Sequence, residues 1–105
     1  MAGGVCNNES DVIRSKDECT EALEELGYQL AKKEYWEGSK KNIPSGCSIR
    51  TLNNRPYLNT KPGVGRGRDD QIPICKGNGK LGKMMYYSND EKRYNSSLYD
   101  IGIIV

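Results

Sequence analysis

The clearest alternation of apolar and polar positions runs from about residue 13 to residue 27. Apolar side chains recur there at i, i+3, i+4 and i+7, which places them on one face of a helix. They are Cys19, Ala22, Leu23 and Leu26. Most of the other positions carry charged side chains, so we expect one short amphipathic helix whose buried face includes a cysteine.

Both ends of this helix carry a signal. Ser15 and Glu18 form a Ser-x-x-Glu capping box, in which the hydroxyl accepts a hydrogen bond from the fourth amide and the carboxylate accepts one from the amide of the cap. Gly27 can adopt the left-handed backbone that ends a helix without steric cost. The sequence therefore predicts a helix that begins after Ser15 and ends before Gly27.

Shorter apolar runs predict strands. Residues 47–52 and 55–59 flank Asn53-Asn54, a pair that tolerates positive φ at both positions, and this pattern is typical of a β-hairpin. Pro56 has no amide to donate, so its strand should lie at a sheet edge or begin or end near the proline. Residues 28–31 alternate like a strand, and residues 71–75 form another short one.

Glycine spacing divides the second half of the chain. Residues 60–70 contain three glycines between charged side chains, a composition that indicates a mobile loop outside the core. Beyond Cys75, further glycines predict a linker. We expect a module over residues 1–75, followed over residues 76–105 by a glycine-rich linker and a C-terminal β arm.

The arm is rich in apolar and β-branched residues, which form strands readily and need to be covered. We expect it either to pair within the domain or to dock on a partner protein. The predicted docking residues are Met84, Met85, Tyr86, Tyr87, Ile101, Ile103, Ile104 and Val105.

Composition indicates a thin hydrophobic core. Leu, Ile and Val number 19 of 105 residues and Phe is absent, whereas seven Tyr and one Trp add amphipathic bulk. A domain of this size with so little aliphatic volume is commonly stabilised by disulfides. The predicted buried positions are Ile13, Cys19, Ala22, Leu23, Leu26, Ile49, Tyr57, Ile72 and Ile74.

The four cysteines are Cys6, Cys19, Cys47 and Cys75, and the chain has no histidine. No Cys-x-x-Cys pair is present, so two disulfides are favoured over a zinc site or a redox motif. Disulfides imply an oxidising compartment: secreted, an organelle lumen or a virion. Without histidine, the Ser/His, Cys/His and His-metal constellations cannot form, and we expect no catalytic residues, metal or cofactor.

Charge is distributed unevenly along the chain. Residues 9–37 carry nine acidic and four basic residues, net −5, whereas residues 40–83 carry ten basic and two acidic, net +8. A basic surface of this kind can bind an anionic glycan or membrane surface, or dock against an acidic copy of the chain. The predicted anion-binding residues are Arg50, Arg55, Lys61, Arg66 and Arg68, with Lys76, Lys80 and Lys83 in support. Nucleic acid is not expected, because disulfides suit neither the cytosol nor the nucleus.

The order of motifs over about residues 6 to 75 resembles a small, largely uncharacterised cysteine-containing module found, often in tandem, in proteins of algae and other protists. The matching motifs are Ile13-x-Ser15-x-x-x-Cys19-x-x-Ala22, Leu26-Gly27, Pro44-x-Gly46-Cys47, Tyr57-Leu58-Asn59 and Ile74-Cys75. The resemblance implies a disulfide-stapled extracytoplasmic module and no particular activity.

The same layout favours one disulfide pairing. Joining Cys19 to Cys47 would tie the helix to the hairpin, and joining Cys6 to Cys75 would close the ends of the module. The pairing of Cys6 with Cys19 and of Cys47 with Cys75 stays open.

We therefore expect a small α+β domain, with one helix on a short antiparallel sheet and no transmembrane segment. The predicted function is that of a non-enzymatic structural or accessory subunit of a larger assembly. The alternative is an extracellular binding module for an anionic glycan or surface.

Overall fold

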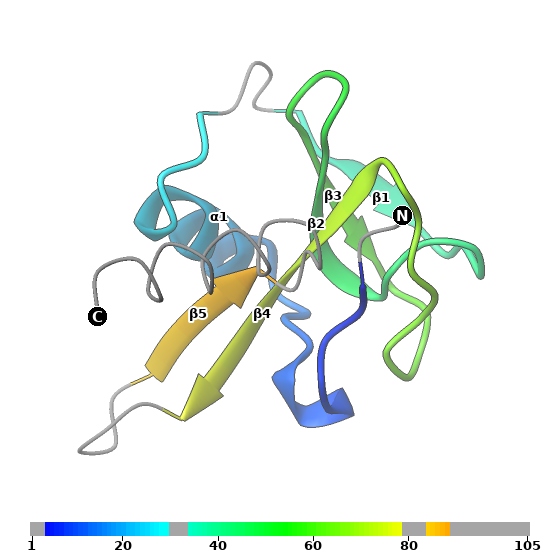
Figure 1. Ribbon diagram of the computed structural model, residues 1–105, viewed down its shortest axis with the longest axis horizontal. Coiled ribbons are helices and arrows are strands. Elements are labelled where there is room, and N and C mark those ends of the chain that lie inside the picture. Colours follow the sequence, from blue (N-terminus) through cyan, green and yellow to red (C-terminus); the bar gives the residue numbers. More distant parts are fainter. Residues whose placement is uncertain (1–3, 30–33, 79–83, 89–105) are drawn as a thin grey trace, which may run out of the picture.

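The computed structural model describes residues 4–29, 34–78 and 84–88 (Figure 1). It shows one α-helix packed on a five-stranded sheet with the strand order β1-β3-β2-β4-β5. The elements are η1 (Glu9–Asp11), α1 (Lys16–Glu25), β1 (Trp36–Gly38), β2 (Gly46–Arg50), β3 (Arg55–Asn59), β4 (Gln71–Asn78) and β5 (Met84–Ser88). The sheet is mostly antiparallel, with β1 parallel to β3. The predicted small α+β domain is confirmed.

The helix follows its sequence signals closely. Ser15 caps it, and the Ser15 hydroxyl accepts a hydrogen bond from the Glu18 amide at 3.3 Å. Gly27 follows the helix with φ +85°, as its position predicted. The Glu18 carboxylate forms an ion pair with Lys76 of β4, with 3.5 Å between its oxygen and Nζ. The hydroxyl half of the capping box is therefore present, while the carboxylate pairs with a lysine.

The predicted hairpin forms with a longer turn than expected. β2 and β3 pair from Gly46↔Asn59 to Arg50↔Arg55, leaving four turn residues rather than two. The Asn54 amide donates to the Arg50 carbonyl at 2.8 Å, and of the asparagine pair Asn54 takes positive φ. The prediction of a two-residue turn is wrong because the ladder stops at Arg50.

β3 is an inner strand of the sheet, since β1 pairs with its other edge from Tyr57 to Asn59. Pro56 lies just before that pairing begins, so its missing amide costs no hydrogen bond to β1. β1 itself was not predicted, and Tyr28 and Gln29, expected to begin a strand, lie outside regular structure. Trp36 of β1 stacks on Tyr57 of β3, with ring centroids 5.1 Å apart, which gives this short strand a tertiary anchor.

The core lies between α1 and the sheet. Of the nine positions predicted to be buried, Leu26 is only half-buried and the others are buried. Ile43 and Asn59, at 0% and 1% exposure, were not predicted. Ile43 lies outside the predicted strands, and Asn59 ends the predicted strand 55–59 but is polar, so neither was expected in the core.

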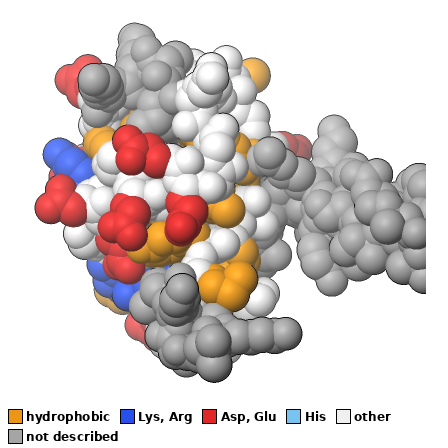
Figure 2. Space-filling model, turned by 90° about the vertical axis from the view of Figure 1, so that its left-hand side faces the viewer, with side chains coloured by type: hydrophobic (Ala, Val, Ile, Leu, Met, Phe, Trp, Pro, Cys, Tyr) orange, Lys and Arg blue, Asp and Glu red, His pale blue; other side chains and the backbone are white. Residues whose placement is uncertain are grey.

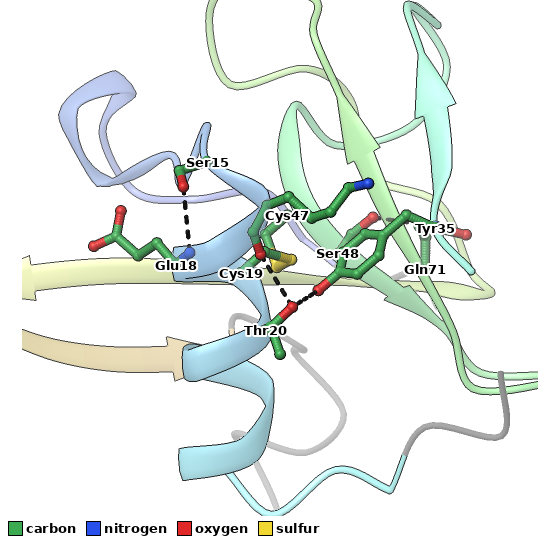
Figure 3. The surroundings of a disulfide bond; sticks show 9 residues. Ser15, Glu18, Cys19, Thr20, Tyr35, Cys47, Ser48 and Gln71 are labelled. Carbon is green, nitrogen blue, oxygen red and sulfur yellow. Dashed lines mark hydrogen bonds between the residues drawn. A yellow bond between two sulfur atoms is a disulfide. The ribbon is translucent and has the colours of Figure 1, made fainter. Parts of the chain in front are cut away.

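Two disulfides join the elements, in the pairing that the sequence favoured. Cys19 of α1 bonds to Cys47 of β2, and Cys6 bonds to Cys75 of β4, with Cα atoms 5.5 Å and 5.7 Å apart. Figure 3 shows the first bond between the helix and the sheet. The Thr20 hydroxyl hydrogen-bonds the Tyr35 hydroxyl beside it. The Cys19–Cys47 disulfide therefore fastens α1 to β2, the middle strand of the sheet.

The glycine-rich segment between β3 and β4 is a loop, as predicted, but it is tied to the domain at several points. The Ser45 amide donates to the Val64 carbonyl at 3.0 Å, and the Arg66 amide donates to the Ile43 carbonyl at 3.1 Å. Arg14 reaches over from the N-terminal segment and donates to the carbonyls of Lys61 and Gly63. These hydrogen bonds were not expected from the glycine-rich composition of the loop.

The position expected as the end of the module lies within a strand. β4 continues past Cys75 to Asn78, and β5 pairs with it antiparallel from Ile74↔Ser88 to Asn78↔Met84. The described part of residues 76–105 thus continues the sheet. The predicted strand residues Ile101, Ile103, Ile104 and Val105 lie outside the described residues.

Candidate functional site

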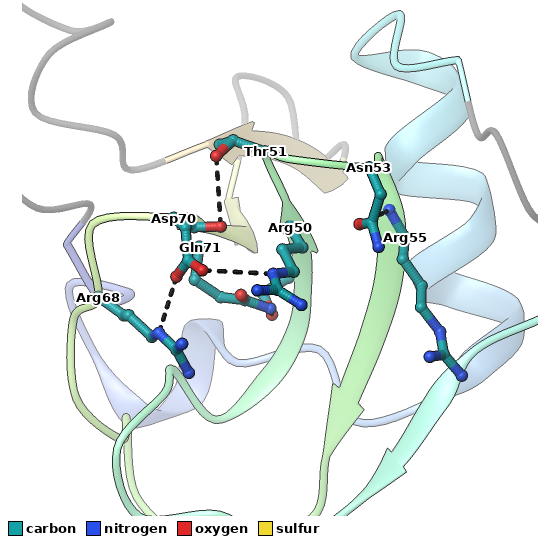
Figure 4. A network of polar contacts seen from close by, with 8 residues as sticks. Arg50, Thr51, Asn53, Arg55, Arg68, Asp70 and Gln71 are labelled. Atoms are coloured by element: carbon teal, nitrogen blue, oxygen red, sulfur yellow. Dashed lines mark hydrogen bonds and ion pairs between the residues drawn. The ribbon is translucent and has the colours of Figure 1, made fainter.

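Two of the five predicted anion-binding residues share one carboxylate. Arg50 of β2 and Arg68 of the loop between β3 and β4 both point toward Asp70 in Figure 4, with Nε–Oδ distances of 3.3 Å and 2.8 Å. The Thr51 amide donates a hydrogen bond to the Asp70 carbonyl at 2.9 Å. Because one negative charge lies between the two guanidinium groups, much of their positive potential is neutralised within the domain.

The other predicted basic residues do not join this pair. Arg55 extends away from Asp70 in Figure 4, and its Nε donates to the Glu34 carbonyl at 3.4 Å. Arg66 is exposed on the loop after β3. Lys76 pairs with Glu18, and Lys80 and Lys83 lie outside the described residues. The arginines therefore do not form the single patch that their proximity in sequence suggested.

Lys61 lies in a different setting, at a surface hollow of about 510 Å³. The lining residues are Ser39, Lys40, Lys41, Asn42 and Lys61, and this lining contains no acidic side chain. We call it the lysine hollow. The Lys40 ammonium also lies 5.5 Å from the centroid of the Trp36 ring, a cation–π distance.

Asn59, at the end of β3, hydrogen-bonds the backbone of two residues that line this hollow. Its buried amide oxygen accepts from the Lys40 amide at 2.8 Å and from the Lys61 amide at 3.4 Å. Its nitrogen donates to the carbonyls of Lys40 and Pro44 at 2.8 Å and 3.0 Å, and to that of Ile43 at 3.4 Å. One buried side chain thus holds the backbone on both sides of the hollow in place.

Sequence reasoning missed Lys40, Lys41 and Asn59 at this position. The Lys-Lys dipeptide is visible in the sequence, but a charge pair in a polar connection usually means a solvated loop. Lys61 lies twenty residues further along the chain, and only the fold of β3 brings it to the same hollow. An asparagine buried among backbone groups has no sequence signature.

The predicted docking residues of β5 are partly used within the domain. Tyr87 donates its hydroxyl hydrogen to Asp11 at 2.6 Å and accepts from the Asn7 amide at 3.2 Å. Tyr86 donates to the carboxylates of Glu21 and Glu18 at 3.3 Å and 3.5 Å. Burial and these carboxylates raise the pKa of Tyr86 to about 12, and burial and the Asp11 hydrogen bond raise the pKa of Tyr87 to about 12.

Met85 of the same strand differs from Tyr86 and Tyr87, which are half-buried, since it is 55% exposed. Figure 2 shows the side of the molecule that carries α1 and β5, where acidic side chains surround apolar ones. The acidic residues of the helix are Asp17, Glu18, Glu21, Glu24 and Glu25. This face is the negative counterpart of the lysine hollow.

The described residues hold no cluster of three or more His, Cys, Asp or Glu side chains that could bind a metal ion. In the same part of the chain, no helix is long and apolar enough to cross a membrane.

Comparison of the chain with protein-family models, with curated proteins and with solved structures finds no match. The resemblance to the cysteine-containing module of algae and other protists stays a prediction.

Proposed function

We propose that the protein is a non-enzymatic structural or accessory subunit of a larger assembly in an oxidising compartment. The two disulfides are compatible with such a compartment. The partner is another protein subunit, and it docks on the β5 side of the sheet.

The exposed methionine on an edge strand carries this proposal. β5 is the last strand on its side of the described sheet, and Met85 presents over half of its side chain to solvent. Methionine is enriched in protein interfaces because its flexible thioether adapts to an apolar pocket. An edge strand also offers backbone groups for pairing with a partner strand.

The neighbouring helix indicates the chemistry of the partner. α1 packs beside β5, and Tyr86 links the two through Glu18 and Glu21. An apolar centre with a charged rim is the usual anatomy of a protein interface. We therefore expect a partner surface with an apolar pocket and basic residues around it.

Two matched substitutions test the proposal. Met85→Glu places a charge at the expected centre of the interface, while Leu52→Glu places one in the β2–β3 turn, at the other large apolar residue exposed in the described part of the chain, 73% exposed. Each tagged variant is produced in cells that make the protein naturally, and its native size is measured by gel filtration. We expect the wild type and L52E in a complex well above 11.8 kDa, and M85E as a free chain.

A wild-type chain that elutes as a free monomer from a freshly prepared native extract would overturn the assembly role. M85E retained in the complex would overturn the docking site at β5. Thermal unfolding of both purified variants serves as the control, because substitutions of exposed side chains should leave the midpoint nearly unchanged.

A second candidate function is the binding of an anionic glycan or surface. The pairing of Arg50 and Arg68 with Asp70 weakens the version of this idea that the sequence suggested. The lysine hollow favours it at another place on the molecule.

A further inference from the structure

We propose that the lysine hollow is a binding site for a sulfated glycan, with Lys40, Lys41 and Lys61 as its cationic contacts. This inference does not depend on the assembly role, because the hollow and β5 use different residues. It also moves the anion site away from the arginines that the sequence indicated.

The charge of the hollow is the first support. Its lining brings together three lysines from two separate segments of the chain, with no acidic residue among the lining residues. The nearest acidic residue of β1, Glu37, is already paired with Lys16 at 2.8 Å. Positive charges grouped on one part of a surface raise the local concentration of anions there.

The backbone of the hollow is held in place before any ligand arrives. Asn59 is 1% exposed and hydrogen-bonds the backbone of Lys40 and Lys61 at the same time. The Thr60 amide adds a bond to the Gly38 carbonyl at 2.7 Å, so the segments on both sides of the hollow are fixed to each other. A preformed site loses less conformational entropy on binding.

Size and neighbouring groups favour a glycan over a single small anion. A volume of about 510 Å³ is within the range of ligand sites and is large enough for one or two sugar rings. Ser39 and Asn42 supply hydroxyl and amide groups suited to sugar hydroxyls.

The expected oxidising compartment favours a sulfated glycan over other polyanions as the ligand. A disulfide-bonded chain meets sulfated glycans outside the cytosol, whereas nucleic acids are concentrated where disulfides are reduced. An anionic membrane is a flat surface and does not require a hollow. We therefore commit to the sulfated glycan and treat the membrane as an outcome of the test.

The probe is a sulfated heparin hexasaccharide, titrated into the oxidised full-length protein and followed by NMR chemical shifts and calorimetry. We expect the largest shifts at residues 39–42 and 59–61. The variant K40Q/K41Q/K61Q should bind about tenfold more weakly or worse, since each lost contact weakens binding severalfold. The charge-preserving variant K40R/K41R/K61R should retain most of the affinity.

The matched control is R55Q/R66Q/R68Q, which removes the same charge from predicted residues outside the hollow. It should retain the affinity within about threefold, because none of these three side chains lines the hollow. Equal losses of affinity in the two glutamine variants would show that only the net charge of the protein matters. That result would overturn the lysine hollow as the binding site. The thermal midpoint of each variant checks that it is folded.

Two further probes address the source of the anion. Inorganic sulfate that binds as tightly as the hexasaccharide would overturn the glycan assignment, because the sugar would then contribute nothing. The glycan assignment would also be overturned if phosphatidylserine vesicles bound the wild type more strongly than K40Q/K41Q/K61Q while the hexasaccharide bound neither.

Discussion

Gly63 and Gly65 belong to the same loop and share a left-handed backbone, with φ of +81° and +77°, but their surroundings differ. A Cβ on Gly63 would meet open space, whereas a Cβ on Gly65 would lie 2.3 Å from the Ser45 nitrogen and 2.6 Å from the Ile43 carbonyl oxygen. Both contacts are backbone atoms, which cannot rotate away. Gly65 therefore allows the loop to lie directly on residues 43–45.

This pair provides a prediction at the residue scale. Gly63→Ala should lower the free energy of unfolding by about 1–2 kcal/mol, the cost of a left-handed alanine. Gly65→Ala should cost about 3 kcal/mol or more, because the loop must also move off the Ile43–Ser45 backbone. Urea unfolding of the two variants measures the difference. Equal losses would show that the close approach at Gly65 is unimportant.

At the scale of elements, two neighbouring tyrosines fasten β5 to the N-terminal half of the chain. Tyr86 bonds to carboxylates of α1, and Tyr87 bonds to Asp11 of η1. Both phenols must stay protonated to donate these hydrogen bonds. An ionised phenolate would instead face a carboxylate at short range.

The pH dependence of stability follows from this arrangement. The pKa of Tyr87 is raised from 10.0 to about 12 in the folded protein, so the folded state holds the phenol proton more tightly than the unfolded chain does. The stabilisation is complete below pH 10 and is lost as the pH rises toward 12. We expect the free energy of unfolding to fall less steeply across this range in Tyr87→Phe than in the wild type. Equal slopes in urea titrations at a series of pH values would contradict the role of Tyr87.

At the scale of the whole molecule, the disulfides compensate for a thin core. They span 28 and 69 residues, for which the loss of chain entropy gives ~3.6 and ~4.4 kcal/mol of stabilisation. Small domains have total stabilities of about 5–15 kcal/mol. The two bonds together are therefore comparable with the whole free energy of unfolding.

Reduction should accordingly unfold the domain or lower its thermal midpoint by tens of degrees. The measurement is thermal unfolding with and without a reducing agent, with mass spectrometry to verify that all four thiols are free. A fully reduced protein that keeps the oxidised midpoint would show that the hydrophobic core alone is sufficient. Alkylation of the reduced thiols prevents the bonds from reforming during the measurement.

Local signals in the sequence determined the parts of this protein that depend on neighbouring residues. The helix from Lys16 to Glu25 follows from its apolar spacing, its serine cap and Gly27, because these contacts close within a few residues. The hairpin follows from a similarly local pattern, although the turn is longer than Asn53-Asn54 alone indicated. The oxidised cysteines follow from the composition of the chain, with its thin core and no histidine.

The tertiary structure alone decided which distant groups meet. β1 exists because Trp36 stacks on Tyr57, and β3 became an inner strand as a result. Asp70 forms ion pairs with both Arg50 and Arg68. The lysine hollow required Asn59 to join segments about twenty residues apart. Such contacts depend on the path of the whole chain, and therefore the sequence supplied the basic residues while the fold selected which of them share a site.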